Sequence, residues 1–316
     1  MSATTHVVAP RPAPALTGRD RGVITVEHLS KRFGNVLAVD DLTFGLARGT
    51  VTGFLGPNGA GKTTTLRMLL GLTRPTGGAA LVFGVPYREI PNPAARVGAV
   101  LEATDFHPGR PGRDHLLMLA YAARLPRQRV DEVLSLVELS GAARRRVGGY
   151  SLGMRQRLGL AAALLGDPEL LILDEPANGL DPEGVHWLRE FLRSFAGEGK
   201  TVLVSSHVLA EVAQTVDDVL IINRGRLVLA SDLQGLIARG GGGVHVVAPE
   251  AARLHDLLLA DGYDTRILDT CELLVRGVTT AEVGELAGAA GVHLHELSTS
   301  TSSLEDVFLE LTAKEA

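Results

Sequence analysis

The chain has 316 residues, of which 45% are hydrophobic and 21% charged, and its formal net charge is −5. This length allows one large domain and one small one, each with its own core. Acidic and basic residues are interleaved, so no nucleic-acid partner is expected. The single cysteine, Cys271, excludes an internal disulfide and is typical of a protein from a reducing compartment.

The first residues do not have the pattern of a targeting segment. Residues 1–20 are rich in proline, alanine and threonine and lack a continuous apolar run, so they predict a disordered leader. The longest apolar candidate elsewhere, residues 158–173, is interrupted by Asp167, Pro168 and Glu169. We therefore expect no membrane-spanning helix.

Residues 21–238 predict a large α/β domain. Its expected strands and helices, in chain order, are an antiparallel β unit at 23–46, a strand at 51–55, a helix at 63–70, helices near 114–124, 128–139 and 151–165, a strand at 170–173, a helix at 182–195, a strand at 201–204 and a hairpin at 219–229. Strands that alternate with helices indicate a parallel sheet. Residues 102–165 form a mostly helical subdomain in this interpretation.

A glycine-rich run, RGGGG at residues 239–243, predicts a linker. The order of elements in residues 244–316 is strand, helix, strand, strand, helix, strand, which predicts a small α+β domain of the ferredoxin-like type. An acidic amphipathic helix is expected at 303–312. His293 and His295 are expected on one face of a last strand at 292–297, but without further ligands they do not predict a metal site.

The strongest chemical motif is GPNGAGKT, residues 56–63, which matches G-x-x-x-x-G-K-[ST] between a strand and a helix. Glycines let backbone N–H groups turn toward phosphates, Lys62 reaches the β and γ oxygens, and the Thr63 hydroxyl can bind Mg²⁺. The residues expected to bind the nucleotide are Gly56, Pro57, Asn58, Gly59, Ala60, Gly61, Lys62, Thr63 and Thr64.

Two further segments carry candidate catalytic residues. In ELLILDEP, Asp174 and Glu175 follow an apolar strand, where Asp174 can hold Mg²⁺ through water and Glu175 can polarise the water that attacks the γ-phosphate. The alternative is a strand that merely ends in charges. His207 ends the strand TVLVSS and could donate a hydrogen bond to the γ-phosphate or the attacking water; the alternative is a structural histidine.

The segment YSLGMRQRL places Ser151 and Gly153 at the start of a helix, where exposed N–H groups favour an anion. With GLDP at residues 179–182, these motifs make residues 23–226 resemble an ATP-binding cassette (ABC) ATPase. The resemblance implies an α/β P-loop cassette with a mixed sheet, an antiparallel β subdomain and a helical subdomain. It also implies that Ser151 and Gly153 contact the γ-phosphate of nucleotide held by an opposite subunit, in a head-to-tail dimer, either a homodimer or a paired cassette.

The same resemblance suggests roles for three other residues and shows two departures. Phe33 lies where the family stacks an aromatic ring on adenine, with a core phenylalanine as the alternative, and Asp181 lies where the family communicates across the dimer. The usual signature LSGGQ is YSLGM here. Glu102 replaces the usual glutamine that links Mg²⁺ to the helical subdomain, a pattern similar to antibiotic-resistance exporters; we expect Glu102 to be a Mg²⁺ ligand and Glu102→Gln to keep substantial hydrolysis.

The resemblance also implies a separate membrane permease, which would hold this ATP-hydrolysing subunit at the cytoplasmic face of the membrane. The expected contact lies around residues 106–113 and includes Arg110 and Arg113. The segment beyond residue 243 is similar to the C-terminal extension of exporters of the daunorubicin-resistance type, which favours export of a drug, antibiotic or lipid. The alternative for this segment is a dimerisation or stability domain, and both can hold. The alternatives are an importer, a soluble cassette protein acting in translation or on DNA, and a module that binds ATP without hydrolysis.

Overall fold

The computed structural model describes residues 22–101, 106–208, 212–233, 235 and 243–300. The chain divides into two compact units, Met1–Ser231 and Asp232–Ala316. Each unit has a hydrophobic core of its own. None of the described helices is both long and apolar enough to cross a membrane.

The first unit contains a three-stranded antiparallel sheet in the order β2-β1-β4. β1 (Ile24–Phe33) pairs with β2 (Val36–Leu46) on one edge and with β4 (Gly77–Val82) on the other. Buried apolar residues recur along β1 and β2, as a half-buried sheet requires. The expected antiparallel unit is confirmed. β4 is a further strand that strand propensity does not predict, because it begins with two glycines.

A six-stranded sheet in the order β5-β6-β7-β3-β8-β9 forms the centre of the first unit. Its strands are β3 (Val51–Leu55), β5 (Val97–Val100), β6 (Leu170–Leu173), β7 (Thr201–Ser206), β8 (Asp218–Asn223) and β9 (Arg226–Asp232). The strands from β5 to β8 in this order pair in parallel, as predicted. β8 and β9 follow one another through Arg224 and Gly225, both at positive φ, which is the backbone of a two-residue hairpin turn.

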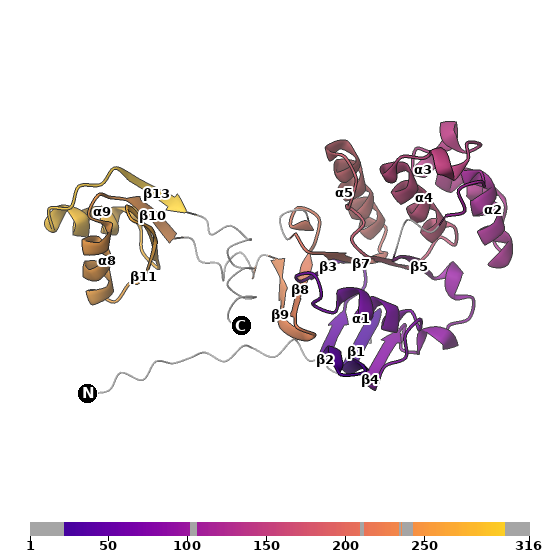
Figure 1. The fold of residues 1–316 in the computed structure, drawn as a ribbon, viewed down its shortest axis with the longest axis horizontal. Coiled ribbons are helices and arrows are strands. Elements are labelled where there is room, and N and C mark those ends of the chain that lie inside the picture. Colours follow the sequence, from indigo (N-terminus) through magenta and orange to yellow (C-terminus); the bar gives the residue numbers. More distant parts are fainter. Residues whose placement is uncertain (1–21, 102–105, 209–211, 234, 236–242, 301–316) are drawn as a thin grey trace. The chain divides into compact units, whose positions relative to one another are not determined.

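Helices cover both faces of this sheet (Figure 1). On one face lies α1, together with the antiparallel sheet, and on the other lie α4 and α5, with α2 and α3 beyond α4. The bounds are α1 (Lys62–Leu69), α2 (Gly112–Ala122), α3 (Gln128–Leu136), α4 (Leu152–Leu164) and α5 (Pro182–Gly197). Short 3-10 helices occupy Tyr87–Glu89, Pro93–Ala95, Ser140–Ala142 and Val147–Gly149. The five helices confirm the predicted ones within a few residues.

The core of the first unit joins the two sheets. Leu170 and Ile172 of β6 and Leu203 of β7 pack in one cluster with buried residues of β1, β2 and α1. Every residue of β3, β6 and β7 is buried, which is the pattern of parallel strands covered on both faces. This packing fixes the carboxyl ends of β3, β6 and β7, where the candidate site lies.

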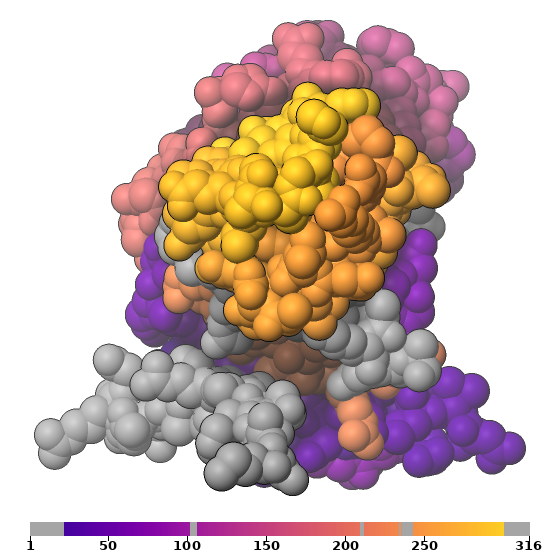
Figure 2. Space-filling view, turned by 90° about the vertical axis from the view of Figure 1, so that its left-hand side faces the viewer, coloured from indigo at the N-terminus to yellow at the C-terminus, as the bar shows by residue number. Residues whose placement is uncertain are grey.

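The second unit is an antiparallel sheet in the order β11-β12-β10-β13 with two helices. Its elements are β10 (Gly243–Val247), α8 (Ala251–Ala260), β11 (Asp264–Asp269), β12 (Glu272–Arg276), α9 (Thr280–Ala289) and β13 (Glu296–Ser300). In the space-filling view this unit, orange to yellow, presents one continuous surface (Figure 2). The observed succession is the βαββαβ order that the sequence predicts.

Two details of the second unit differ from the prediction. β10 begins at Gly243, the last glycine of the expected linker. The last strand begins at Glu296 rather than at residue 292, so His293 and His295 precede it and do not share a strand face. The physical reason is Val292, which is 5% exposed and packs into the core directly after α9 without joining the sheet. The leader and the helix expected at 303–312 lie outside the described residues.

Candidate active site

The phosphate loop leads from the end of β3 into α1. Gly59 and Gly61 adopt positive φ, and α1 begins directly after Gly61, so the first N–H groups of the helix have no partner within it. A Cβ on Gly56 would lie 2.4 Å from the carbonyl oxygen of Ile222, and a Cβ on Gly61 would lie 2.5 Å from that of Ala38. Backbone packing therefore requires glycine at both positions.

The remaining loop residues differ in exposure. Ala60 is buried, Pro57 and Thr64 are half-buried, and Asn58 and Thr63 are exposed. The Ala60 N–H donates to the Pro57 carbonyl at 3.1 Å, which closes the turn. An exposed turn that ends in a helix N-terminus is suited to binding phosphate.

Lys62, the first residue of α1, is only 6% exposed. Its Nζ donates to the Gly56 carbonyl at 2.6 Å and to the Pro57 carbonyl at 3.4 Å. The same Nζ lies 3.2 Å from Oε1 of Glu175. A buried ammonium needs this number of partners, and the three contacts hold it at the mouth of the loop.

The two acidic residues after β6 have separate partners. Thr63 Oγ1 donates to Asp174 Oδ2 at 2.6 Å, so the end of β6 meets the start of α1. Oδ1 of Asp174 accepts a hydrogen bond at 2.5 Å from Ser205 of β7. The Ser205 hydroxyl in turn accepts from the Glu175 N–H at 2.9 Å. Ser205 thus orients both acidic residues, and the sequence reasoning missed it, although the residue stands in the TVLVSS strand beside His207.

Glu175 contacts the other two candidate catalytic residues. Its Oε2 lies 2.8 Å from His207 Nδ1, while its Oε1 faces Lys62. Because an ionised carboxylate can only accept, Nδ1 of His207 carries the proton in this contact and Nε2 is left for another partner. Glu175 has φ 48°, a conformation that is costly outside glycine and concentrates at functional sites.

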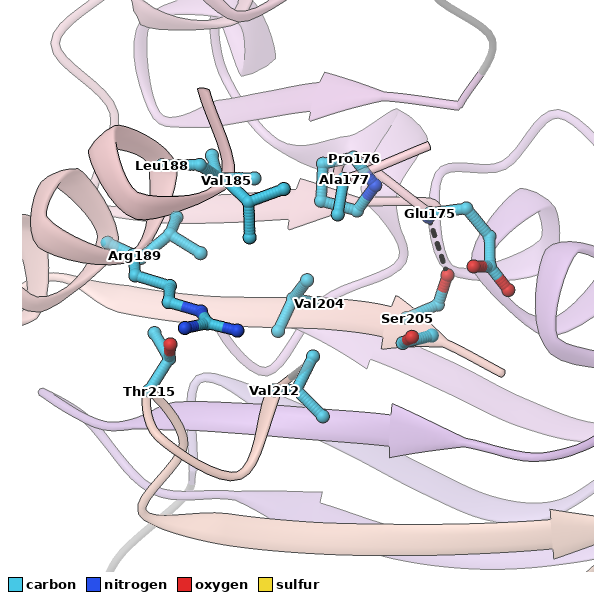
Figure 3. A pocket seen from close by; sticks show the side chains of 12 residues that line it. Glu175, Pro176, Ala177, Val185, Leu188, Arg189, Val204, Ser205, Val212 and Thr215 are labelled. Atoms are coloured by element: carbon cyan, nitrogen blue, oxygen red, sulfur yellow. Dashed lines mark hydrogen bonds between the residues drawn. The ribbon is translucent and has the colours of Figure 1, made fainter. Parts of the chain in front are cut away.

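An apolar pocket lies behind Glu175, between α5, β7 and the segment that follows β7 (Figure 3). Its walls are mostly aliphatic, with Arg189 and Thr215 at one end. The buried Arg189 Nε and Thr215 Oγ1 have no hydrogen-bond partner among the described residues. Glu175 and Ser205 belong both to this pocket and to the cluster around Lys62, while no residue of the phosphate loop lines the pocket.

Three other predicted residues, Ser151, Gly153 and Asp181, lie at the starts of α4 and α5. Ser151 is the N-cap of α4 and accepts from the Met154 N–H at 3.2 Å, and Asp181 is the N-cap of α5 and accepts from the Gly184 N–H at 2.9 Å. A Cβ on Gly153 would lie 3.5 Å from a methyl group of Leu180, so the two helix starts are neighbours. No contact joins Ser151 to Lys62 in the described part of the chain.

Phe33 ends β1, and its ring is 50% exposed with Lys31 Nζ 4.8 Å from the ring centroid. The core alternative for this phenylalanine is therefore wrong. It lies in the β1–β2 hairpin, and β2 approaches the phosphate loop where the Ala38 carbonyl faces Gly61. Glu102 lies outside the described residues. Elsewhere in the described ranges, no group of three or more His, Cys, Asp or Glu residues could hold a metal ion.

Comparison with known proteins agrees with this geometry. A family described as "ABC transporter" matches residues 39–178, and a "Domain of unknown function (DUF8746)" matches residues 242–305. The Nod factor export ATP-binding protein I of Burkholderia lata is 37% identical over 305 residues, which cover 92% of this chain and 97% of that protein. The chain belongs to the ATP-binding proteins of ABC transporters.

Two further relatives and a solved structure extend this family. The bacitracin transport ATP-binding protein BcrA of Bacillus licheniformis is 44% identical over 65% of this chain and 68% of its own length. The daunorubicin resistance ATP-binding protein DrrA3 of Streptomyces coeruleorubidus is 36% identical over 92% of this chain and 95% of its own length. A solved ATP-binding subunit of an ABC transporter matches with a TM-score of 0.63 and 28% identity, over 69% of this chain and 92% of that one. This ABC subunit is therefore an ATP-binding and ATP-hydrolysing cassette.

Proposed function

We propose that this subunit drives the export of an amphiphilic small molecule, of the drug, antibiotic or lipid class, by closing and opening a head-to-tail dimer on a membrane permease. The observation that carries the export direction is the similarity to the Nod factor export subunit along 92% of the chain, which includes the second unit. Relatives named for bacitracin transport and daunorubicin resistance support the same direction.

The residues of the cluster fit a Mg²⁺-ATP substrate. Thr63 Oγ1 and Asp174 Oδ2 are two oxygen ligands 2.6 Å apart beside the phosphate loop, and Mg²⁺ prefers oxygen ligands. Mg²⁺ would neutralise charge on the β- and γ-phosphates. Lys62 then exchanges its bonds to the Gly56 and Pro57 carbonyls for phosphate oxygens, and Glu102 is proposed as a further ligand.

Glu175 and His207 supply the acid–base chemistry in this proposal. When Lys62 turns to the phosphates, Oε1 of Glu175 becomes free to accept a proton from the attacking water. His207 holds Oε2 through Nδ1 and presents Nε2 as a hydrogen-bond partner for the γ-phosphate or the water. Removal of either group is expected to slow hydrolysis by a factor of about 10²–10⁴.

The second half of each site comes from another copy of the cassette. Ser151 is exposed and Gly153 is half-buried at the start of α4, and this helix start has no lysine of its own. In the proposed dimer this helix start meets the γ-phosphate bound by the other copy, and Phe33 stacks on the adenine. Hydrolysis removes the γ-phosphate that holds the two copies together, so the dimer opens.

A permease with membrane-spanning helices completes the transporter in this proposal and holds the subunit at the cytoplasmic face of the membrane. The exposed side chains of Met118 and Tyr121 on α2, together with residues 106–113 that lead into its first turn, offer a surface for that contact. Arg113 is held by a two-bond ion pair with Asp131 of α3, which links this surface to the rest of the helical subdomain.

The proposal is tested by capturing the complex. A tagged Glu175→Gln variant is trapped with Mg²⁺-ATP in its own cells, and the proteins that co-purify from solubilised membranes are identified. We expect a multi-span permease, and we expect the Lys62→Ala, Glu175→Gln control to lose its ATP-dependent enrichment. Recovery of ribosomes, of DNA or of the subunit alone would favour the soluble alternatives instead.

A further inference from the structure

The first half of α4 contacts the segment that leads into α5. Gly179 has φ 77°, and a Cβ at this position would lie 2.0 Å from Cδ2 of Leu152, so the backbone of the segment lies directly against that leucine. One turn later the Gln156 side chain donates to the Asn178 carbonyl at 3.1 Å. The start of α4 and the loop before α5 are therefore joined on one side.

A third contact reaches α5 itself. The Arg157 guanidinium lies 4.6 Å from the centroid of the Trp187 ring, and the Trp187 ring stacks on Phe191 at 5.7 Å. Arg157 also pairs with Glu138 and donates to the Val137 carbonyl at 3.4 Å. Its side chain is only 17% exposed, and a cation over an aromatic ring is held more strongly when water is excluded.

This contact spans a gap in the packing between the two helices. An apolar hollow separates α4 from α5, and Arg157 and Trp187 both line it, with Leu160, Leu180 and Leu188. The hollow is small and its lining is mostly apolar, so the Arg157 guanidinium over the Trp187 ring is a polar contact at the edge of an apolar helix interface. The Arg157–Trp187 pair is one direct contact between the two helices beside this hollow.

We propose that Arg157 and Trp187 are positioning residues for the signature half-site. Ser151 caps the helix that carries Arg157, and Asp181 caps the helix that carries Trp187. Together with the Leu152–Gly179 and Gln156–Asn178 contacts, the pair therefore helps to fix the two helix starts relative to one another. This inference rests on the proposed function, because Ser151 and Asp181 must meet the second copy of the cassette together in the closed dimer. A looser pair widens the range of orientations and lowers the fraction of chains that is ready to close.

The test measures the Mg²⁺-ATP concentration at which half of the protein is dimeric, in a Glu175→Gln background, by light scattering. We expect Trp187→Ala to raise this concentration about tenfold, and Trp187→Phe to raise it less, because phenylalanine keeps a ring beneath Arg157. Nucleotide affinity of the monomer, measured with a fluorescent analogue, should not change, since Lys62 and the phosphate loop do not contact either residue.

Lys200→Ala is the matched control. Lys200 Nζ lies 5.0 Å from the ring of Phe195, near the other end of α5, and pairs with Asp167 and Glu198. Removal of the Lys200 side chain costs stability without touching the start of α4. The Mg²⁺-ATP concentration at which half of the protein is dimeric should therefore stay within about twofold of that of the Glu175→Gln protein. If Lys200→Ala raises the Mg²⁺-ATP concentration for half dimerisation as much as Trp187→Ala does, lost stability explains both effects. That result would overturn the positioning role.

Trp187 supplies a second readout, because it is the single tryptophan of the chain. Arg157→Ala should change the fluorescence emission of Trp187 in the nucleotide-free monomer. It should also raise the Mg²⁺-ATP concentration at which half of the protein is dimeric, as Trp187→Ala does. If the Glu175→Gln protein dimerises with Mg²⁺-ATP, and Trp187→Ala and Arg157→Ala in that background dimerise at the same Mg²⁺-ATP concentration, the inference is wrong and the proposed dimer stands. If the background itself does not dimerise with Mg²⁺-ATP, the proposed function and this inference both fail.

Discussion

At the scale of single residues, one hydroxyl connects the two acidic groups of the site. Ser205 donates to Asp174 and accepts from the N–H of Glu175, which holds the Glu175 backbone at its unusual φ. Asp174 contacts Thr63, while Glu175 contacts Lys62 and His207. The arrangement of Asp174 and Glu175 in this cluster therefore depends on the hydroxyl group of Ser205.

Ser205→Ala should lower the rate of ATP hydrolysis about tenfold and raise the Mg²⁺ concentration needed for half of the maximal rate. Asp174 loses a buried donor and the Glu175 N–H loses its acceptor, and each loss costs about 1–3 kcal/mol. Phosphate release measured across a Mg²⁺ titration checks both effects. The control is Ser206→Ala, whose hydroxyl bonds to the Val208 backbone, and it should change neither value by more than about twofold. Equal effects of the two substitutions would contradict the assignment.

Motif spacing predicts the residues of the phosphate loop and the acidic pair, because the loop needs glycines at fixed positions and the strand must end in acids. The partners of those residues are harder to predict. Ser205 comes from a different strand, and only the parallel pairing of β6 with β7 brings it to Asp174. The contact of Lys62 with Glu175 depends in the same way on the order of β3, β7 and β6 in the sheet.

At the scale of elements, α2 carries a histidine in an unfavourable position. His115 is half-buried, its Nδ1 has no hydrogen-bond partner among the described residues, and the Phe106 ring meets it edge-on at 5.0 Å. Burial, with a smaller contribution from the positive charge of Arg110, lowers the pKa of His115 below its ordinary value of 6.5. The folded state therefore favours neutral His115.

The helical subdomain should lose stability as the pH falls below about 6.5. Between the lowered folded pKa of His115 and its unfolded pKa, the unfolded chain binds more protons, so the free energy of unfolding decreases with falling pH across that window. His115→Gln should reduce this loss, because glutamine does not titrate. Urea midpoints of both proteins at pH 7.5 and 5.5 provide the measurement. A pH dependence that stays unchanged in the variant would show that other groups cause it.

Periodicity predicts the long helices and the buried strands well, since their apolar patterns are strong. Periodicity does not identify β4 and β5, because GGAALV and VGAV are short and contain glycine, and pairing with β1 and β6 decides their structure. For the last strand of the second unit, the apolar pattern instead predicts a start at residue 292, before the observed start at Glu296. Val292 is apolar and buried but lies in a connection, so burial alone does not identify a strand.

At the scale of the whole molecule, the described residues of each unit form a core cluster of their own, and these two clusters share no residue. Leu254 of α8 is fully buried in the second core. Leu254→Ala should destabilise the second unit by about 2–5 kcal/mol through the cavity it leaves. Hydrolysis by the isolated subunit should stay within about twofold of the parent protein, because the site lies in the first unit.

Differential scanning calorimetry checks this prediction, with only one of two transitions expected to move. The matched control is Leu257→Ala on the same helix, where a side chain that is 40% exposed should cost less than about 1 kcal/mol. A loss of hydrolysis in Leu254→Ala, with the first transition unchanged, would instead show that the second unit acts on the active site.

The proposed dimer combines, in each active site, the phosphate loop of one copy with the helix start at Ser151 of the other. It is tested by mixing two inactive variants, Lys62→Ala and Gly153→Asp. The second is accommodated in the monomer, because an added Cβ meets a Leu180 methyl group at the ordinary distance of 3.5 Å, while its carboxylate repels the γ-phosphate.

The most direct measurement is the hydrolysis rate of an equal mixture of the two variants. Each variant alone should be about 10²–10³-fold slower than the parent protein. Half of the dimers in the mixture are mixed, and each of these has one intact site, so the rate should recover to about a quarter of the parental value. A mixture as inactive as its components, or a Gly153→Asp variant that hydrolyses ATP normally, would contradict the composite site.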